Sequence, residues 1–203
     1  WQYNLYLQAQ AGAGLIEGSA VKQPGWGWAG DNPVVSVSWY DAVQYANWLS
    51  EQHGRTPAYV IDEEQPDTNN ISDMDRLKWT VARRENANGY RLPAAAEWAH
   101  AALGGSAPAF EYAGSNRPDE VAWHGENAQK RTRAVAGKKP NAFGLYDLTG
   151  NVWEWCWDWD SEMRYRIVRG GAWGNLAANI RIADVGKRTP DSRGDQYGFR
   201  VMQ

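Results

Sequence analysis

A run of alternating tryptophans constrains the fold of this chain more than any other stretch of its sequence. Residues 150–160 read GNVWEWCWDWD, and one side of the alternation is formed by Trp153, Trp155, Trp157 and Trp159. A period of two is typical of an extended strand whose two faces meet different surroundings. We therefore predict a central strand here, with its tryptophan face packed on helices or covering loops.

The only cysteine of the chain lies within this strand. Glu154 and Asp158 flank Cys156 on its own face, and their negative charges would raise the thiol pKa and suppress the thiolate that a nucleophile needs. We therefore interpret Cys156 as an inert structural residue. A single cysteine also excludes an intrachain disulfide.

Two helices are predicted with defined starts. The first covers residues 38–53, because Ser38 and Asp41 have the spacing of a capping box and an apolar stripe with helical period follows. The second covers residues 94–103, a stretch rich in strong helix formers, and Pro93 suits its first turn. A glycine follows each segment, as is common where helices end.

The remaining apolar stretches are short and predict strands joined by long loops. Residues 1–12 are predicted as a short helix, and VVSVS (34–38), RIVRGGAW (166–173) and YGFRVM (197–202) as strands. Residues 55–90, with TPAYVID (56–62) and LKWTV (77–81), are predicted to hold one or two short strands around a loop. Twenty-one glycines and nine prolines, spread throughout, favour much irregular backbone. No internal repeat is visible, and we expect one α+β domain over residues 1–203.

Composition narrows the classes of function. The formal net charge of −3 shows no basic excess that would point to nucleic acid, so no nucleic-acid partner is expected. No apolar run reaches the length of about 18 residues that a membrane-spanning helix needs. The three histidines are dispersed and predict no transition-metal centre. The chain begins at Trp1 without a signal-peptide pattern, so we expect a trimmed start that would hide any export signal.

Two segments have more than one interpretation on the residues alone. YDLTGNVWE places Asp147, Gly150 and Glu154 around a turn, and the carboxylates and exposed carbonyls of such a turn are oxygen ligands that Ca²⁺ prefers. The same residues also form an ordinary turn. The polar segment 174–197 is either a solvent-exposed loop or a binding surface carried by the strands on both sides of it.

Five blocks in order resemble the formylglycine-generating-enzyme (sulfatase-modifying-factor) family. They are NPVVSVSWYDAVQYANWLS, GYRLPAAAEWAHAALGG, NAFGLYDLTGNVWEW, RIVRGGAW and GFR. The likeness covers residues 33–203. It implies a C-type-lectin-like fold of the α+β class, with two helices, small twisted antiparallel sheets and long ordered loops.

The resemblance also bears on the calcium interpretation. Members of this family hold a structural Ca²⁺ beside the motif that reads GNVWEW here. Carried over to this sequence, the ligands would be the carboxylates of Asp147 and Glu154 and the backbone carbonyls of Gly150 and Val152.

The resemblance does not carry the activity of the family. Formylglycine-generating enzymes use two cysteines just after the motif that reads GGAW here, where they bind copper and activate O₂. This chain has GNLAANIRI at that place, without a cysteine. Without thiolates neither a soft copper site nor thiol exchange with a substrate can form, and no copper or iron is expected. The alternatives are a cysteine-independent oxidase of this family and an accessory subunit.

Residues 170–200 are similar to the variable region of family members that a retroelement diversifies at adenines. In that branch asparagine codons give rise to a scattered set of small, polar and aromatic residues, and Lys187 and Gln196 depart from this pattern. The predicted ligand-binding residues are Trp173, Gly174, Leu176, Ala178, Asp184, Val185, Gly186, Arg188, Asp191, Ser192, Gly194, Asp195 and Tyr197.

This branch implies a non-enzymatic display protein. Its scaffold would present segment 174–197 to a macromolecular ligand, most simply another protein, with rigid aromatic and adaptable polar side chains in the division that paratopes use. Several such proteins are bacterial surface lipoproteins, so the resemblance implies an exported or surface location, with membrane contact only through a lipid anchor outside this chain.

Overall fold

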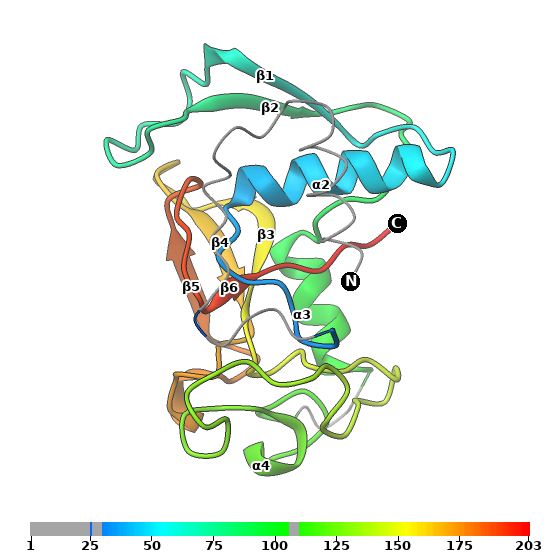
Figure 1. The fold of residues 1–203 in the computed structure, drawn as a ribbon, viewed down its shortest axis with the longest axis vertical. Helices are drawn as coiled ribbons and strands as arrows, with labels where there is room; N and C mark the ends of the chain where they lie inside the picture. The colour runs from blue at the N-terminus through cyan, green and yellow to red at the C-terminus, as the bar shows by residue number, and fades with distance from the viewer. Residues whose placement is uncertain (1–24, 26–29, 106–109) are drawn as a thin grey trace.

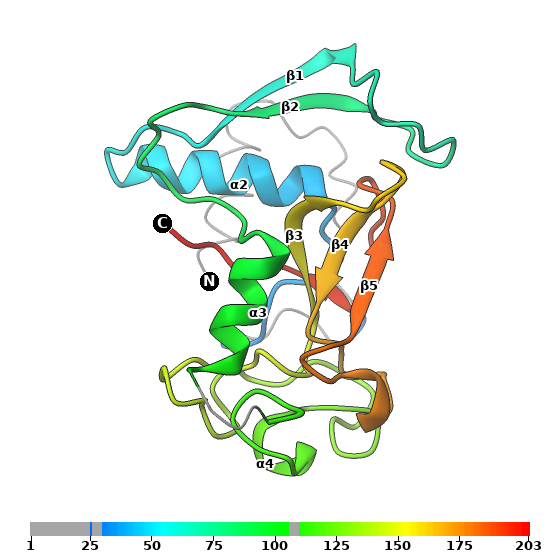
Figure 2. The ribbon, with the colours of Figure 1, turned by 180° about the vertical axis from the view of Figure 1, so that it is seen from behind.

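The computed structural model describes residue 25 and residues 30–105 and 110–203. Helix α2 (Trp39–Gln52) lies between a hairpin, formed by β1 (Tyr59–Pro66) and β2 (Trp79–Arg83), and a four-stranded sheet (Figures 1 and 2). The predicted helix over residues 1–12 lies outside the described residues. Among the described residues, no helix combines the length and apolar composition that crossing a bilayer requires.

Helix α2 begins and ends as its sequence predicts. The Asp41 backbone N–H donates to Ser38 Oγ at 3.1 Å, and Asp41 Oδ2 accepts from the Ser38 backbone N–H at 2.6 Å, which together form the capping box. Gly54 follows the helix with φ of 64°, a left-handed conformation that glycine adopts without a steric cost.

Helix α3 (Ala95–Leu103) has two carboxylates at its N-terminus. Glu97 accepts from the Ala94 backbone N–H at 2.8 Å, and Asp158 from the next strand accepts from the Ala95 N–H at 2.6 Å. Both satisfy backbone donors that have no partner within the helix, and their negative charge complements its dipole. Pro93 lies just before the helix and not in its first turn.

The four-stranded sheet has the order β5-β4-β3-β6. Its strands are β3 (Trp153–Trp159), β4 (Arg166–Arg169), β5 (Val185–Arg188) and β6 (Tyr197–Gly198). Strands β3, β4 and β5 are antiparallel, but β6 pairs with β3 in parallel, so the sheet is mixed and not purely antiparallel as predicted. Residues 160–196, which include β4 and β5, connect β3 to β6 and provide the long crossover that a parallel pair requires.

Three predicted strands need correction. Strand 166–173 ends at Arg169, because Gly170 and Gly171 adopt left-handed φ values of 95° and 77°. Residues 34–38 form no strand, because Ser36 adopts a left-handed φ of 65° that interrupts the extended backbone, although Val35 and Val37 are both buried. The predicted final strand 197–202 is reduced to the two residues of β6 and one isolated bridge at Met202. The polar segment 174–197 holds strand β5, which its exposed side chains concealed, and the short 3₁₀ helix η1 (Ala177–Asn179). The four-residue helix α4 (Pro118–Val121) is too short to show a period and was not predicted.

The two faces of β3 pack on different helices, as the alternation predicts. Trp155 is fully buried against α2 and donates its indole N–H to the Val37 carbonyl at 3.0 Å. On the other face Cys156 is fully buried beside Trp98 and Ala102 of α3. Burial raises the pKa of the Cys156 thiol, and the neighbouring carboxylates raise it further. This thiol therefore has neither the access nor the ionisation that a nucleophile needs.

A buried cation completes the tryptophan face. The Arg166 guanidinium lies 3.7 Å from the ring centroid of Trp39 and 3.8 Å from that of Trp159, and it donates to the Trp157 carbonyl. Burial lowers its pKa to about 9. Cation–π contacts of this kind are strongest when the cation is desolvated, so the aromatic rings take the place of an acidic partner.

The ion pair at the start of α3 gives a pH-dependent prediction. Arg91 holds Glu97 through two hydrogen bonds of 2.7 Å, and with the Ala94 N–H this lowers the pKa of Glu97 from 4.5 to about 2. A lowered folded-state pKa stabilises the protein above the unfolded value and loses that effect as the pH falls. We expect Glu97→Gln to lower the free energy of unfolding by about 1 kcal/mol near neutral pH, since solvent screens this partly exposed pair.

Urea denaturation between neutral pH and pH of about 2 checks this. The difference between Glu97→Gln and the wild type should shrink below pH 4.5 and be small near pH 2. Glu85→Gln, a change of an exposed carboxylate that makes no ion pair among the described residues, is the matched control. A difference that does not depend on pH would contradict the assignment.

Candidate functional site

The predicted ligand-binding residues all reach the surface. None of the thirteen is buried, and Leu176 and Val185 are the most open of the apolar ones, at 62% and 53% exposed. Neighbouring residues of the same segment are buried, among them Ile180 and Ile182. Segment 174–197 therefore has an inner set that packs on the scaffold and an outer set that includes every predicted residue.

One group of these residues lies together. The Trp173 indole N–H donates to the Asp195 carbonyl at 2.9 Å, which joins the two ends of the segment. Arg188 Nε donates to the Tyr197 hydroxyl, and its guanidinium carbon is 5.1 Å from the centroid of that ring. Gly174 lies close to the Gln196 side-chain amide, where an added Cβ would be 3.1 Å from its nitrogen. We define the 173–197 surface by Trp173, Gly174, Arg188, Asp195 and Tyr197.

The sheet positions two members of this surface, Tyr197 and Arg188. Tyr197 of β6 pairs with Trp153, and Arg188 of β5 pairs with Arg166, so both side chains lie on the sheet face that α2 covers farther along. Strand β5 is the edge of the sheet, and the side of β5 away from β4 is open (Figure 1). Gly186 lies on β5, two residues before Arg188. A larger residue would not fit there, because an added Cβ would be 2.6 Å from the Val168 side chain.

Several of the other predicted residues lie apart from this surface, although Gly194 contacts Tyr197. Val185 has the register of Arg169 and so lies on the opposite face of the sheet from Arg188. Leu176 and Ala178 belong to the η1 region, which lies toward the end of the molecule that carries α4 (Figure 2). Asp184 and Asp191 use carboxylate oxygens to accept backbone N–H groups at 2.8 and 3.1 Å. The thirteen residues thus do not form one continuous patch.

Framework contacts fix the 173–197 surface to α2. Arg193 forms two hydrogen bonds of 2.8 and 2.9 Å with Asp41, and the Trp39 backbone N–H donates to the Pro190 carbonyl at 2.9 Å. Gln196, which departs from the adenine pattern, is half-exposed between Asp195 and Tyr197 and is a further member of the surface. In the sequence, only its position between the predicted residues Asp195 and Tyr197 could have indicated that Gln196 belongs to this surface.

The residues proposed to bind calcium lie at a second place. Asp147, Val152 and Glu154 help to line a cavity of about 410 Å³, whose other walls include apolar side chains such as Leu145 and Phe199. The Asp147 carboxylate accepts from the Ala136 backbone N–H at 2.7 Å, and burial raises its pKa. The arrangement brings the two predicted carboxylates to one cavity.

Protein donors already occupy the Glu154 carboxylate. Arg200 binds both of its oxygens at 2.6 Å, and the Trp98 indole N–H donates to Oε2 at 2.6 Å. A Ca²⁺ ligand must present free oxygen lone pairs to the ion, and a guanidinium at this distance repels a second cation. In the described part of the chain, no three acidic, histidine or cysteine side chains gather as a metal site. As arranged, Glu154 fits a guanidinium and not a metal ion.

Comparison with known proteins finds relatives whose names indicate different functions. The family model for the sulfatase-modifying factor enzyme 1-like domain matches residues 15–203. The chain is 40% identical to chaperone protein LppX of Paenibacillus barcinonensis, over 85% of this chain and 70% of that protein. It is 29% identical to formylglycine-generating enzyme of Streptomyces coelicolor, over 84% of this chain and 52% of that protein.

A solved structure extends the likeness to the fold. Treponema denticola variable protein 1 superimposes with a TM-score of 0.73 at 30% identity, over 91% of this chain and 76% of that one. The chain has a single cysteine, so the catalytic cysteine pair of formylglycine-generating enzyme is absent. With the mixed sheets, the few helices and the family match over nearly its whole length, this chain belongs to the sulfatase-modifying factor family and has the C-type-lectin-like α+β fold of formylglycine-generating enzyme.

Proposed function

We propose that this protein is a non-enzymatic binding protein that holds another protein at its 173–197 surface. The observation that supports this most directly is that none of the predicted contact residues of segment 174–197 is buried, while Ile180 and Ile182 of the same segment pack on the scaffold. A rigid scaffold that carries an exposed irregular segment is where folds commonly place recognition. The missing cysteine pair argues against the oxidase of this family.

The chemistry of the surface favours a protein ligand. Tyr197 and Trp173 offer rigid aromatic area, and their polar atoms are held by Arg188 and by the Asp195 carbonyl. Aromatic residues ordered in this way lose little conformational entropy when they bind a partner. With a net charge of −3 the chain has no basic excess for nucleic acid.

Two relatives suggest how such binding is used. One is named a variable protein and another a chaperone, and both names are compatible with binding to other proteins. We infer a display protein of the first kind, diversified by a retroelement and exposed on or exported from a bacterial cell. A chaperone with one fixed client is the second candidate, favoured by the 40% identity to LppX.

The binding proposal predicts which side chains a partner needs. The double variant Arg188→Ala with Tyr197→Ala should reduce capture of a partner from the surface fraction of the source cells by at least about tenfold, because buried Tyr and Arg carry much of the energy of interfaces. Val185→Ser, on the same strand but the opposite face, is the matched control and should capture as the wild type does. Thermal unfolding verifies that all variants fold, and equal capture by all of them would rule out this surface.

Diversification predicts a genomic feature. A near-identical copy of the coding sequence for residues 170–200 should lie near the gene, differ from it only at adenines, and adjoin a gene for a reverse transcriptase. Sequencing of the locus checks this. Without such a copy, the diversified display protein is excluded and the chaperone-like candidate remains.

The calcium ligands remain a proposal that depends on Arg200. We expect Ca²⁺ to bind the Asp147 and Glu154 carboxylates only where Arg200 does not hold Glu154. In Arg200→Met, added Ca²⁺ should raise the melting temperature more than in the wild type, since the variant leaves buried carboxylates without a cation. Adding Glu154→Gln to Arg200→Met should remove the effect, and if Arg200→Met melts at the same temperature with Ca²⁺ and with chelator, the ligand set is wrong.

A further inference from the structure

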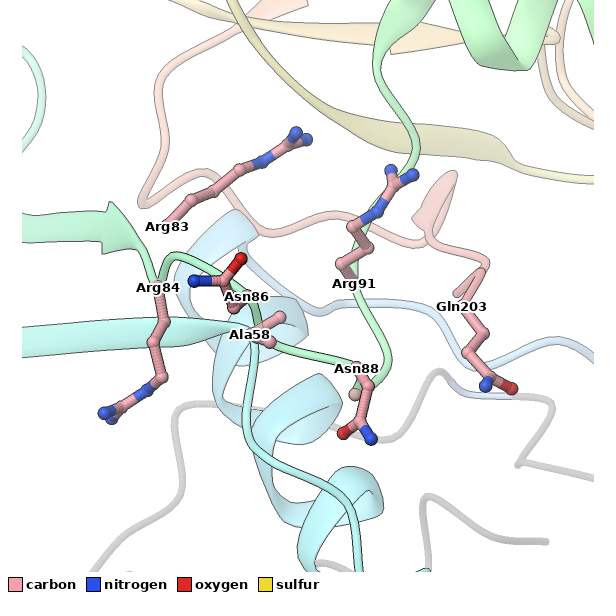
Figure 3. A pocket seen from close by; sticks show the side chains of 9 residues that line it. Ala58, Arg83, Arg84, Asn86, Asn88, Arg91 and Gln203 are labelled. Atoms are coloured by element: carbon pink, nitrogen blue, oxygen red, sulfur yellow. The ribbon is translucent and has the colours of Figure 1, made fainter.

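A second cavity lies at the other end of α2 from the 173–197 surface. It has a volume of about 420 Å³, within the usual range of small-molecule sites, and lies between the start of β1, the end of β2 and the turn that follows (Figure 3). Pro190 and Arg193, which lie between Arg188 and Asp195 in the chain, contact the first turn of α2. Gly89, in the turn beside the cavity, packs on Ser50 in the last turn of the helix. A helix of 14 residues separates them by roughly 20 Å.

The lining of this cavity is basic. Its nine lining residues include Arg83, Arg84 and Arg91, and none of the nine is acidic. Asn86 and Asn88 add neutral amide groups. Asn88 Oδ1 accepts from the Thr56 backbone N–H at 2.9 Å. The side-chain amide of Asn88 can therefore still donate its N–H groups to a ligand. The side chains that line the cavity therefore offer donors and positive charge, and none of them is an anion.

Arg83 and Arg91 reach the same side of the cavity, toward β3 and α3, while Arg84 points away (Figure 3). The guanidinium carbon of Arg83 lies 4.8 Å from the centroid of the Trp157 ring. Arg91 is paired with Glu97 at 2.7 Å and so carries a neutralised charge. Arg83 makes no hydrogen bond or ion pair with any described residue, which leaves its in-plane N–H groups available.

The wall that carries these residues is fixed. At Gly89 an added Cβ would be 2.4 Å from both Ser50 Oγ and the Thr56 carbonyl oxygen, so the turn is pressed against the end of α2. The Tyr90 backbone N–H donates to Ser50 Oγ at 2.8 Å. Arg83 on its tryptophan and Arg91 in its ion pair are thus held on a preformed frame, which lowers the ordering cost of binding.

We propose that this cavity binds a carboxylate group through Arg83. One unpaired guanidinium points into it, which matches a ligand group of a single negative charge. A guanidinium presents a planar fork of donors that a carboxylate accepts with two parallel hydrogen bonds, and the Arg91–Glu97 pair has this geometry next to the cavity. The carboxylate belongs to a small organic acid or to the C-terminus of a peptide, since both present the same group.

Isothermal titration calorimetry on the full chain tests this with four probes: succinate, a short peptide with a free C-terminus, the same peptide amidated, and inorganic phosphate. Saturable binding of succinate assigns a small acid, and binding of the free peptide alone assigns a chain end. Binding of neither, equal binding of the amidated peptide, or binding of phosphate alone overturns the proposal.

Two substitutions that each remove one positive charge locate the site. Arg83→Gln should weaken binding of the probe at least about tenfold, while Arg84→Gln, whose side chain points away, should weaken it by less than about twofold. Equal weakening by both would mean a general effect of charge and would overturn the assignment. Arg83→Lys keeps the charge and loses the fork, so it should bind more weakly than the wild type even if Arg83→Gln does not fold.

These measurements do not involve the 173–197 surface. Arg188→Ala with Tyr197→Ala should leave the affinity for the carboxylate probe unchanged, so a failure of the protein-binding proposal and a failure of this one are separate results.

Discussion

The buried carboxylate of Glu154 holds together segments that the backbone alone would leave apart. It lies on the central strand and accepts donors from Trp98 of α3 and from Arg200 near the C-terminus. Its side chain is only 5% exposed. A buried ion pair adds little to stability beyond what apolar packing would give, but removing one partner leaves an uncompensated charge and costs about 3–5 kcal/mol. The geometry around Glu154 is therefore strongly specified.

This constraint explains how a two-residue strand can support the proposed binding surface. Strand β6 makes few ladder hydrogen bonds, and alone it would fray. Arg200, three residues after Tyr197, anchors the chain from one side through Glu154. Arg193 anchors it from the other side through Asp41. Tyr197 lies between two fixed points, so its ring is presented in one orientation although its strand is short.

Local signals in the sequence predicted the helices but not these anchors. The capping box of α2 and the alternation of β3 depend on residues within a few positions of one another, so spacing alone reveals them. Arg200 lies 46 positions from Glu154 in the chain, and no periodicity reports such a pair. The left-handed Ser36 and the parallel β6 likewise follow from tertiary packing and not from propensity. The calcium ligands stay a prediction, and no local signal in the sequence reports the Arg200 guanidinium that binds one of the two carboxylates.

The two proposed sites share a helix but not a mechanism for communication. Coupling between distant sites requires an element with two arrangements that both ligands bias. Helix α2 is capped at its start by Ser38 and Asp41 and closed at its end by Gly54, and fully buried Trp39, Val43 and Ala46 hold one of its faces against the core. A close-packed helix of this kind has no second low-energy position. The fold is thus a rigid support for both proposed sites, one at each end of α2, and we expect the two sites to bind their ligands independently.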